Sequence, residues 1–529
     1  MRQQTLLAVA IATISASGMN AAHATPFMPM DARGLAMGNT GVASARRAHA
    51  PAYNPSLLSK AEDDDDFAII LPQFGLTVAD EDEMIDTAQD INDKIVPALE
   101  DIISSNNTDD ISDTVDDLTE IALNLEGALA SNNVEEIGRL NGELGDELDY
   151  LENLLDDLNN TVGDLDTALN SISGSPLSGR TGLSAAIAFP GKKFAAAISL
   201  AGNANFSGRM IYSNNDSNLL LAYGDAASGY VDAVQELQSG VSDALNETNS
   251  ISQAVAFSSL EDDAAALQSY SSDEVQTADG TIRIIDGGEL SEEAKDAEMD
   301  SQLQVLGLAM AEVGLSISRE FDISGQPIAI GITPKLQKAT TFHYVTELDN
   351  EDSKISKSDF EDATVNSTKI NLDVGVSWSL SDSGKWVVGL VGKNLMGGTF
   401  ETADAEVHGA LTSRTVKGQD IKLSPQFRTG LAYNGSWTTI AIDLDLIEND
   451  PVAYENATRY ASIGAEFDVF STLQLRAGFR NNLAVSQSNV ASVGLGVSPF
   501  GLHIDIAALM NLSKPEKEAG VAAELGFYF

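Results

Sequence analysis

Ile-Asn-Leu-Asp-Val-Gly-Val-Ser-Trp-Ser-Leu, residues 370–380, decides the fold: every even position is apolar and every odd position is small or polar. Four further stretches alternate in the same way, namely 440–446, 461–468, 473–480 and 502–508. A period of two places successive side chains on opposite faces of a β-strand. Each of these strands therefore meets an apolar environment on one face and a wet or glycine-lined one on the other.

A soluble β-sandwich and a membrane barrel both produce this alternation, and the connections favour the barrel. Every short connection follows an even-numbered strand, and every long connection follows an odd-numbered one. This sorting is typical of a transmembrane barrel with both termini in the periplasm, so we expect the long connections outside the cell. The fourteen strands that we expect are 67–79, 182–190, 194–213, 303–320, 327–348, 368–380, 385–396, 421–434, 436–447, 457–468, 471–482, 489–498, 501–512 and 519–529.

The strand ends agree with a barrel in the outer membrane. Trp378 and Trp386 flank one short turn and Trp437 borders another, as in an aromatic girdle at the membrane interface. The last strand alternates and places Phe527 and Phe529 on one face, which resembles the signal that the outer-membrane insertion machinery reads. The sequence therefore predicts an all-β fold, a fourteen-stranded antiparallel outer-membrane barrel over 67–529.

The N-terminus is typical of an export signal. Arg2 supplies a positive charge, residues 6–14 an apolar core, and Ala22-His23-Ala24 a cleavage site. We expect residues 1–24 to be a signal peptide that is cleaved near Ala24. A retained membrane anchor is the weaker interpretation, because the apolar run is well short of ~20 residues. No later segment approaches ~18 uncharged apolar residues, so any membrane span must consist of strands.

Composition excludes several classes of function. The 529 residues include 79 acidic and 30 basic ones, a net charge of −49, which argues against nucleic acid as a partner. The absence of cysteine excludes disulfides, thiolate zinc sites and cysteine nucleophiles. His503 and Asp505 share one strand face, yet no sequence motif supplies a nucleophile, a metal site or a cofactor site. We expect no enzyme activity and no cofactor.

The negative charge is concentrated in two insertions, which we place at 80–181 and 214–302. Residues 61–170 hold 32 acidic residues against 2 basic ones, and residues 221–300 hold 18 against 2, so the rest of the chain is nearly neutral. In the first insertion apolar residues recur every three or four positions from Ile137 to Leu169, the pattern of a coiled-coil helix about 50 Å long. The helix closes its seam within its own hairpin, which we favour, or forms a projecting arm that docks a partner. The second insertion is mixed, with a helix near 230–245 and a strand-like run at 281–285.

Two short motifs near the N-terminus carry a family resemblance. Asp-Ala-Arg-Gly-Leu-Ala-Met-Gly-Asn-Thr-Gly-Val-Ala, 31–43, is followed by Ala-Tyr-Asn-Pro-Ser-Leu-Leu, 52–58. This pair resembles the N-terminal segment of FadL-type outer-membrane transporters, which folds as a hatch inside a fourteen-stranded barrel. The resemblance implies a hatch over residues 25–66, with the motif residues Gly34, Met37, Gly38, Gly41, Asn54 and Pro55.

The chain downstream of the signal peptide also resembles the outer-membrane TraF-like family of conjugal plasmid transfer proteins. The stretches that carry this resemblance are 331–335, 390–395, 438–451, 475–483 and 492–505. It implies a barrel in the outer membrane and a role in conjugation.

Polar residues on the strand faces opposite the lipid are expected to line the lumen. Our preferred cluster sets Arg476 and Arg480 against Asp443 and Asp445, two strands apart. Such a network acts as a polar gate or simply pairs the wall with the plug. We favour wall-to-plug pairing, because barrel lumens are polar by default.

Two functions remain open from the sequence. The first is a structural or interaction role at the cell surface, as the TraF-like resemblance implies, with the helical insertion contacting a surface protein. The second is a FadL-type channel for hydrophobic small molecules. In that case a kink in the third strand opens the wall laterally, although the same residues more simply twist a long strand: Gly202, Asn203, Asn205 and Gly208. Further expected partners are outer-membrane lipids and lipopolysaccharide, the latter bridged to surface carboxylates by divalent ions. The acidic run 62–66 we interpret as solvated charge.

Overall fold

The computed structural model describes residues 26–60, 67–105, 108–277, 280–323, 325–348, 357–380, 384–408, 413–470, 472–486 and 488–528. The expected signal peptide, the acidic run 62–66 and Phe529 lie outside these residues. Among the described residues, every helix is too short or too polar to cross a lipid bilayer.

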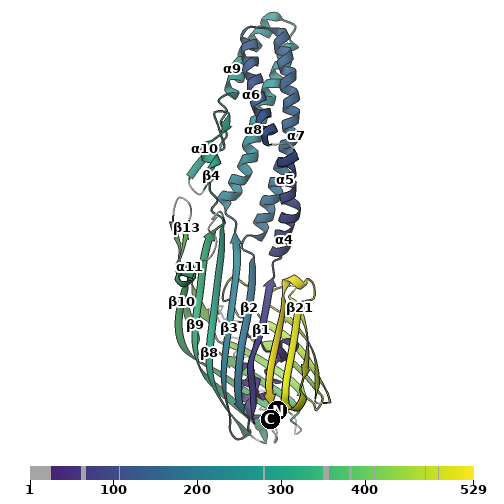
Figure 1. The fold of residues 1–529 in the computed structure, drawn as a ribbon, viewed down its shortest axis with the longest axis vertical. Helices are drawn as coiled ribbons and strands as arrows, with labels where there is room; N and C mark the ends of the chain where they lie inside the picture. The colour runs from purple at the N-terminus through teal and green to yellow at the C-terminus, as the bar shows by residue number, and fades with distance from the viewer. Residues whose placement is uncertain are drawn as a thin grey trace, which may run out of the picture.

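Within the described residues, fourteen antiparallel strands form a closed barrel (Figure 1). Each strand pairs with its neighbours in chain order, and β1 closes the ring by pairing with β22. All fourteen predicted strands are present in the barrel, with clearly different starts for three of them. β2 and β10 begin several residues earlier than expected, and the strand expected from 421 begins at Gln426, because 420–423 pairs in a separate sheet. The strands are β1 (Ala68–Asp80), β2 (Pro176–Phe189), β3 (Ala195–Ile211), β8 (Gln302–Ile323), β9 (Gln326–Glu347), β10 (Thr364–Ser379), β11 (Trp386–Lys393), β16 (Gln426–Asn434), β17 (Thr438–Asp445), β18 (Tyr460–Val469), β19 (Leu473–Asn482), β20 (Asn489–Val497), β21 (Leu502–Asn511) and β22 (Ala519–Tyr528).

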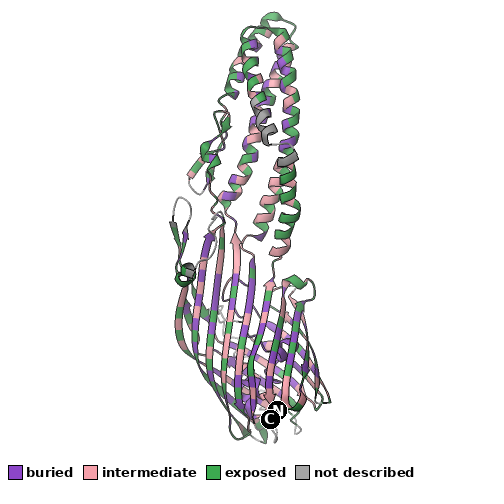
Figure 2. Ribbon diagram, viewed as in Figure 1, coloured by how far each residue is buried: buried purple, intermediate pink, exposed green. Residues whose placement is uncertain are grey.

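Buried and exposed residues alternate along the barrel strands (Figure 2). On β17, Ile442 is 49% exposed while the adjacent Asp443 is 1% exposed. On β21, Ile506 is 55% exposed beside Asp505 at 1%. A soluble protein would bury such isoleucines, whereas lipid solvates them. The barrel therefore presents a lipid-facing surface.

The two ends of the barrel differ. Both described chain ends and the short turns lie at one end, here called the turn end, and the helices rise from the other, the loop end (Figure 1). Aromatic pairs mark the turn end: Trp386 lies 5.2 Å from Tyr433, and Trp437 lies 6.1 Å from Phe467, between ring centroids. This arrangement agrees with the predicted girdle.

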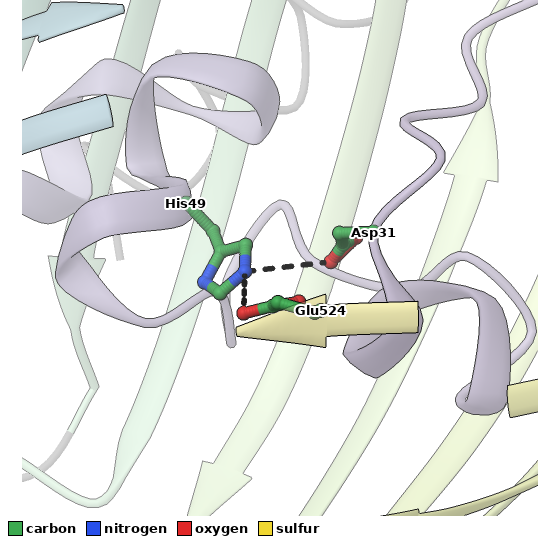
Figure 3. A group of neighbouring side chains, drawn as sticks. All are labelled: Asp31, His49 and Glu524. Atoms are coloured by element: carbon green, nitrogen blue, oxygen red, sulfur yellow. Dashed lines mark ion pairs between the residues drawn. The ribbon is translucent and has the colours of Figure 1, made fainter. Parts of the chain in front are cut away.

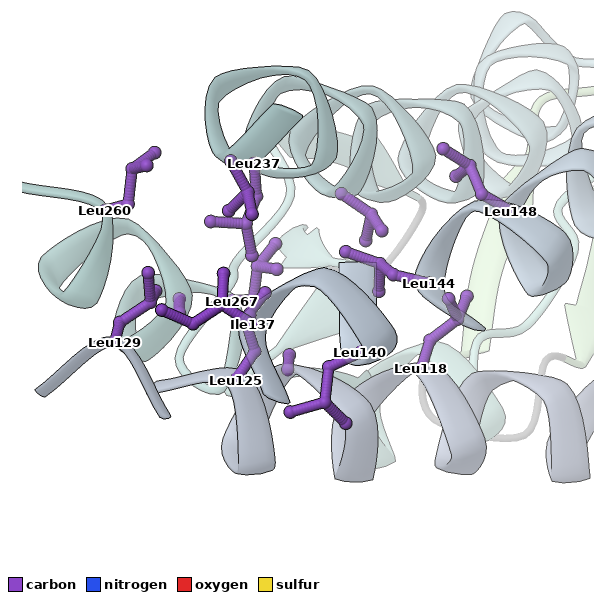
Figure 4. Close-up of a cluster of buried hydrophobic side chains, with 14 of the residues drawn as sticks. Leu118, Leu125, Leu129, Ile137, Leu140, Leu144, Leu148, Leu237, Leu260 and Leu267 are labelled. Carbon is purple, nitrogen blue, oxygen red and sulfur yellow. The ribbon is translucent and has the colours of Figure 1, made fainter. Parts of the chain in front are cut away.

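At the loop end the two acidic insertions form a single helical arm. The first insertion contributes α4 (Met84–Asp90), η3 (Ile91–Ile95), α5 (Val96–Ser105), α6 (Thr108–Ala130) and α7 (Val134–Ile172); the second contributes α8 (Asn214–Leu245) and α9 (Ser250–Leu267). These six α-helices and η3 are called the arm below. Leu144 of α7 and Leu237 of α8 are buried in one shared core (Figure 4). The expected hairpin that closes its own seam is therefore wrong, because α8 and α9 of the other insertion complete the core.

Several short strands and helices lie at the loop end. Two further two-stranded sheets, β12 (Gly398–Glu401) with β15 (Asp420–Leu423) and β13 (Ala405–His408) with β14 (Ser413–Val416), lie between β11 and β16. Phe400 and Leu423 of the first sheet pack on Leu306 and Leu308 of the inner face of β8. The remaining elements are β4 (Glu274–Thr277), β5 (Gly280–Arg283), β6 (Ile285–Asp286), β7 (Glu289–Leu290), α10 (Glu292–Lys295) and α11 (Lys357–Asp362).

Candidate functional site

The N-terminal residues 26–60 fold inside the barrel and are called the hatch (Figure 1). Their elements are α2 (Ala32–Ala36), η1 (Arg47–His49), α3 (Ala50–Tyr53) and η2 (Pro55–Ser59). α2 begins after Asp31, whose carboxylate accepts a 2.9 Å hydrogen bond from the Gly34 amide and so caps the helix. The expected hatch is thus a buried helical segment.

The two motifs of the hatch pack on each other. The Tyr53 ring lies so close to Gly34 and Gly41 that a Cβ at either position would overlap it. The Tyr53 hydroxyl donates a 2.7 Å hydrogen bond to Asp31. Glycine at these two positions is therefore a packing requirement, because the ring occupies the space that a side chain would take.

The other motif residues fix the hatch backbone. Gly38 has a φ of +68°, and its amide donates a 3.1 Å hydrogen bond to the Ser492 hydroxyl of β20. Asn54 donates to the Val42 carbonyl at 2.9 Å and caps η2, which begins at Pro55. Met37 is fully buried where the hatch meets the wall.

Glycines of the barrel wall make room for the hatch. A Cβ on Gly478 would overlap the backbone of Met37 and Gly38, and one on Gly389 would overlap the Val42 carbonyl. Three other wall glycines abut the hatch in the same way: Gly331, Gly375 and Gly464. The hatch therefore rests directly on strand backbone.

Buried ion pairs also join the hatch to the wall, on β18 and β19, which carry Gly464 and Gly478. Glu466 of β18 accepts two hydrogen bonds of 3.1 Å from Arg33 of the hatch. Arg476 of β19 lies 2.5 Å from Glu466 and 2.5 Å from Asp505. Arg46 of the hatch approaches Glu466 at 3.6 Å.

The four predicted lumen residues all lie inside the barrel, but their partners differ from those expected. Arg480 pairs with Glu518 and donates to Asn39 of the hatch at 2.8 Å. Asp445 pairs with Arg428 at 2.5 Å. Asp443 accepts hydrogen bonds from the hatch amides of Gly41 and Val42 at 2.8 and 3.0 Å. The predicted pairing of Arg476 and Arg480 with Asp443 and Asp445 is therefore wrong.

Strand register explains the partners. Glu466 lies directly opposite Arg476, and Arg428 lies directly opposite Asp445. Asp443 and Arg480 both lie opposite Ser462, which is on the strand between them. Asp443 nevertheless accepts its hydrogen bonds from backbone amides of the hatch. Strand alternation in the sequence also places Arg428 and Glu466 on the inner face, but it does not show which residues they pair with. If the strand register were known, both pairs could be predicted, because the two members of each pair lie directly opposite each other on neighbouring strands.

Asp31, His49 and Glu524 form a separate buried cluster between hatch and wall (Figure 3). His49 Nε2 lies 2.9 Å from Glu524 of β22 and 3.9 Å from Asp31. Burial raises the pKa of Asp31. Burial alone would lower the pKa of His49, but the Glu524 carboxylate holds it above its ordinary value. Sequence analysis did not identify this cluster, because its three members are far apart in the chain.

A cavity of about 130 Å³ lies beside the hatch. Hatch residues 26–30 and the strands β2, β3 and β8–β10 line it, and Glu312 and Lys335 form an ion pair of 3.3 Å on its wall. β3 pairs without a register shift with both neighbours, so the ladder continues through the predicted kink at Gly202, Asn203, Asn205 and Gly208. These residues form part of a regular wall.

A closed barrel with a lipid-facing exterior and an internal hatch defines an outer-membrane β-barrel protein. A protein-family model described as "F plasmid transfer operon, TraF, protein" matches residues 51–445. The chain belongs to this family. The search of curated proteins gave no matching sequence.

Solved structures of similar shape include transporters of the outer membrane. The Ralstonia pickettii toluene transporter TbuX has 9% sequence identity and a TM-score of 0.45, over 95% of this chain and 99% of that one. The Pseudomonas putida toluene transporter TodX has 11% identity and a TM-score of 0.42, over 96% and 99%. A Pseudomonas aeruginosa FadL homologue has 7% identity and a TM-score of 0.42, over 96% and 99%.

Proposed function

We propose that this protein anchors an acidic helical arm in the outer membrane and presents it at the cell surface to a partner protein during plasmid transfer. The observation that carries the proposal is the arm itself, which two separate insertions build jointly at one end of the barrel. The family description supports the link to plasmid transfer. The role is non-catalytic.

Orientation supports a position outside the cell. Barrels of this class keep short turns and both termini in the periplasm and long connections outside. The arm rises from the end opposite the short turns (Figure 1). A projecting arm can therefore reach a second surface.

The distal part of α9 is the surface that we assign to the partner. Residues 248–260 contain no charged side chain, although residues 221–300 carry 18 acidic ones. Ile251 and Val255 are 75% and 66% exposed on this segment, and acidic Glu247 and Glu261 flank it. An apolar patch with an acidic rim fits a partner protein that exposes apolar residues beside lysine or arginine.

The test measures plasmid transfer from donor cells that carry arm variants. Replacing residues 82–174 and 213–300 with short glycine-serine turns should abolish the contribution of this protein to transfer, while the barrel remains heat-modifiable in the outer membrane. Ile251→Asp combined with Val255→Asp should reduce transfer, because two charges enter the apolar patch. Tyr150→Asp, at a position 41% exposed on α7, is the matched control and should transfer normally. Normal transfer by the armless barrel would refute the proposal.

The cavity favours a second function, a channel for small hydrophobic molecules. About 130 Å³ is close to the ~150 Å³ of an engineered protein cavity that binds benzene. Ala186 of β2 lines the cavity, and Ala186→Trp should fill it. The channel would be established if Ala186→Trp stops the uptake of radiolabelled toluene while the armless variant preserves it. Equal uptake by both variants and by cells lacking the protein would exclude the channel.

A further inference from the structure

The cluster of Asp31, His49 and Glu524 has the donor set of a transition-metal site. One imidazole nitrogen and two carboxylate oxygens lie within 4.8 Å of one another, and all three residues are buried. Zn²⁺ binds nitrogen and oxygen at ~2.0–2.2 Å in tetrahedral sites, which sets ligand atoms roughly 3.4 Å apart. The two separations from His49 Nε2, 2.9 and 3.9 Å, lie on either side of this value.

Hydrogen bonds satisfy Asp31, whereas among the described residues the Glu524 carboxylate has only its ion pair with His49. Among the described residues, neither carboxylate oxygen of Glu524 receives a hydrogen bond, although the side chain is 1% exposed. His49 Nε2 approaches Glu524 without the alignment of a hydrogen bond. The neighbouring arginines Arg33 and Arg476 instead contact Glu466. The second oxygen of this buried carboxylate has no partner among the described residues, which is costly, and a bound cation would satisfy it.

Neighbouring groups hold the ligands in place. The Tyr528 hydroxyl lies 3.2 Å from His49 Nδ1, which orients the ring and leaves Nε2 directed at the cluster. Asp31 is fixed by the Tyr53 hydroxyl and by the Gly34 amide. Groups that orient ligands in this way are typical of built metal sites.

We propose that Asp31, His49 and Glu524 bind one divalent transition-metal ion, with Zn²⁺ favoured by the mixed nitrogen and oxygen donors. The site joins the hatch to β22, so the ion fastens the hatch to the barrel wall. Two carboxylates balance the charge of the ion, and binding of the ion displaces any proton from His49 Nε2. The inference does not depend on the role of the arm.

The test uses the full-length barrel, purified in detergent and stripped with a chelator. Co²⁺ is titrated while visible absorption is followed, because tetrahedral Co²⁺ gives an intense d–d band that six-coordinate ions on surface carboxylates lack. Zn²⁺ then competes for the same site, and bound metal is counted by elemental analysis. We expect one tight equivalent in the unmodified chain.

Three variants separate the site from weak binding by the acidic arm. His49→Ala and Glu524→Gln should each lower affinity by about 10–100-fold and abolish the Co²⁺ band. Glu524→Gln conserves volume, so it decides the matter if His49→Ala does not fold. His343→Ala, at another buried histidine of the barrel, should bind as the unmodified chain does. A missing band in the unmodified chain, or equal binding by Glu524→Gln, would overturn the proposal.

Discussion

The carboxylate of Glu466 lies among three guanidinium groups, two from the hatch and one from the wall. Arg33 and Arg476 bond it directly, and Arg46 lies at 3.6 Å. Glu466, Arg33 and Arg476 are buried and Arg46 is half-buried, so their interaction is only weakly screened. Removal of this single negative charge would leave three cations around one position.

Glu466→Gln should therefore loosen the hatch. Breaking a buried ion pair by removing one partner costs ~3–5 kcal/mol, because the remaining charge stays buried without compensation. We expect a lower midpoint of heat modification on gels and larger ion conductance in planar bilayers. Glu83→Gln, which loses solvent-exposed pairs with Lys514 and Lys517, is the control and should change stability far less, because water screens such pairs. Unchanged conductance in Glu466→Gln would show that this network does not retain the hatch.

Gly478 tests how closely the hatch rests on the wall. A Cβ there meets backbone atoms of the hatch, which cannot rotate away as a side chain can. Gly478→Ala should cost ~1–3 kcal/mol by overpacking and expose the hatch to protease in detergent. Gly202→Ala on β3 is the matched control, because nothing lies within 4 Å of the added Cβ. Equal protection of the hatch in both variants would contradict the close seat.

At this scale the sequence predicts which side chains face the lumen but not which ones pair. Strand parity alone places Asp443, Asp445, Arg476 and Arg480 inside. Pairing depends on register and on the hatch, whose amides bind Asp443 across some 400 positions of the chain. Local periodicity of the sequence shows neither the strand register nor the position of the hatch.

Among the elements, the arm depends on contacts between the two insertions. Val241 of α8 is fully buried against the core that α6 and α7 also line (Figure 4). The side chain of Asn141 on α7 donates a 2.8 Å hydrogen bond to Ser242 on α8. A destabilising substitution in the second insertion should therefore also destabilise the helices of the first.

Val241→Asp should loosen helices of both insertions. Burying an unpaired carboxylate costs several kcal/mol, and the described core that surrounds Val241 consists of apolar side chains. We expect new protease cuts within 134–172, a lower helical signal in circular dichroism and an intact, heat-modifiable barrel. Ile251→Asp introduces the same charge at an exposed position of α9 and should leave the helices folded. Cuts confined to 214–267 would mean that the first insertion is stable alone.

Periodicity is sufficient for the elements and insufficient for their assembly. The steps of three and four after Ile137 predict one long helix, and α7 spans Val134–Ile172 as a single element. The apolar stripe of a helix shows that it needs a partner without specifying which helix supplies it. The assembly of the strands was easier to predict than that of the helices, because each barrel strand pairs with the next barrel strand in the chain.

At the scale of the whole molecule, charge is divided along the long axis. Outside the acidic insertions the chain is nearly neutral overall, and inside the barrel charges form buried pairs such as Arg428 with Asp445, whereas the arm concentrates negative charge in solvent. This division follows from the two environments, because lipid excludes unpaired charge and water tolerates it. It also makes the orientation of the chain in the membrane experimentally accessible.

The chain contains no cysteine, so single introduced cysteines report orientation without background. Ser131→Cys, in the turn between α6 and α7, should react with a membrane-impermeant maleimide in intact cells, because we place the arm outside. Lys193→Cys, in the exposed short turn between β2 and β3, should react only after the outer membrane is permeabilised. Both sites are exposed and lie outside helices and strands, so labelling compares location rather than folding. The reverse pattern would place the arm in the periplasm, and the surface role would then be untenable while the barrel and its hatch would stand.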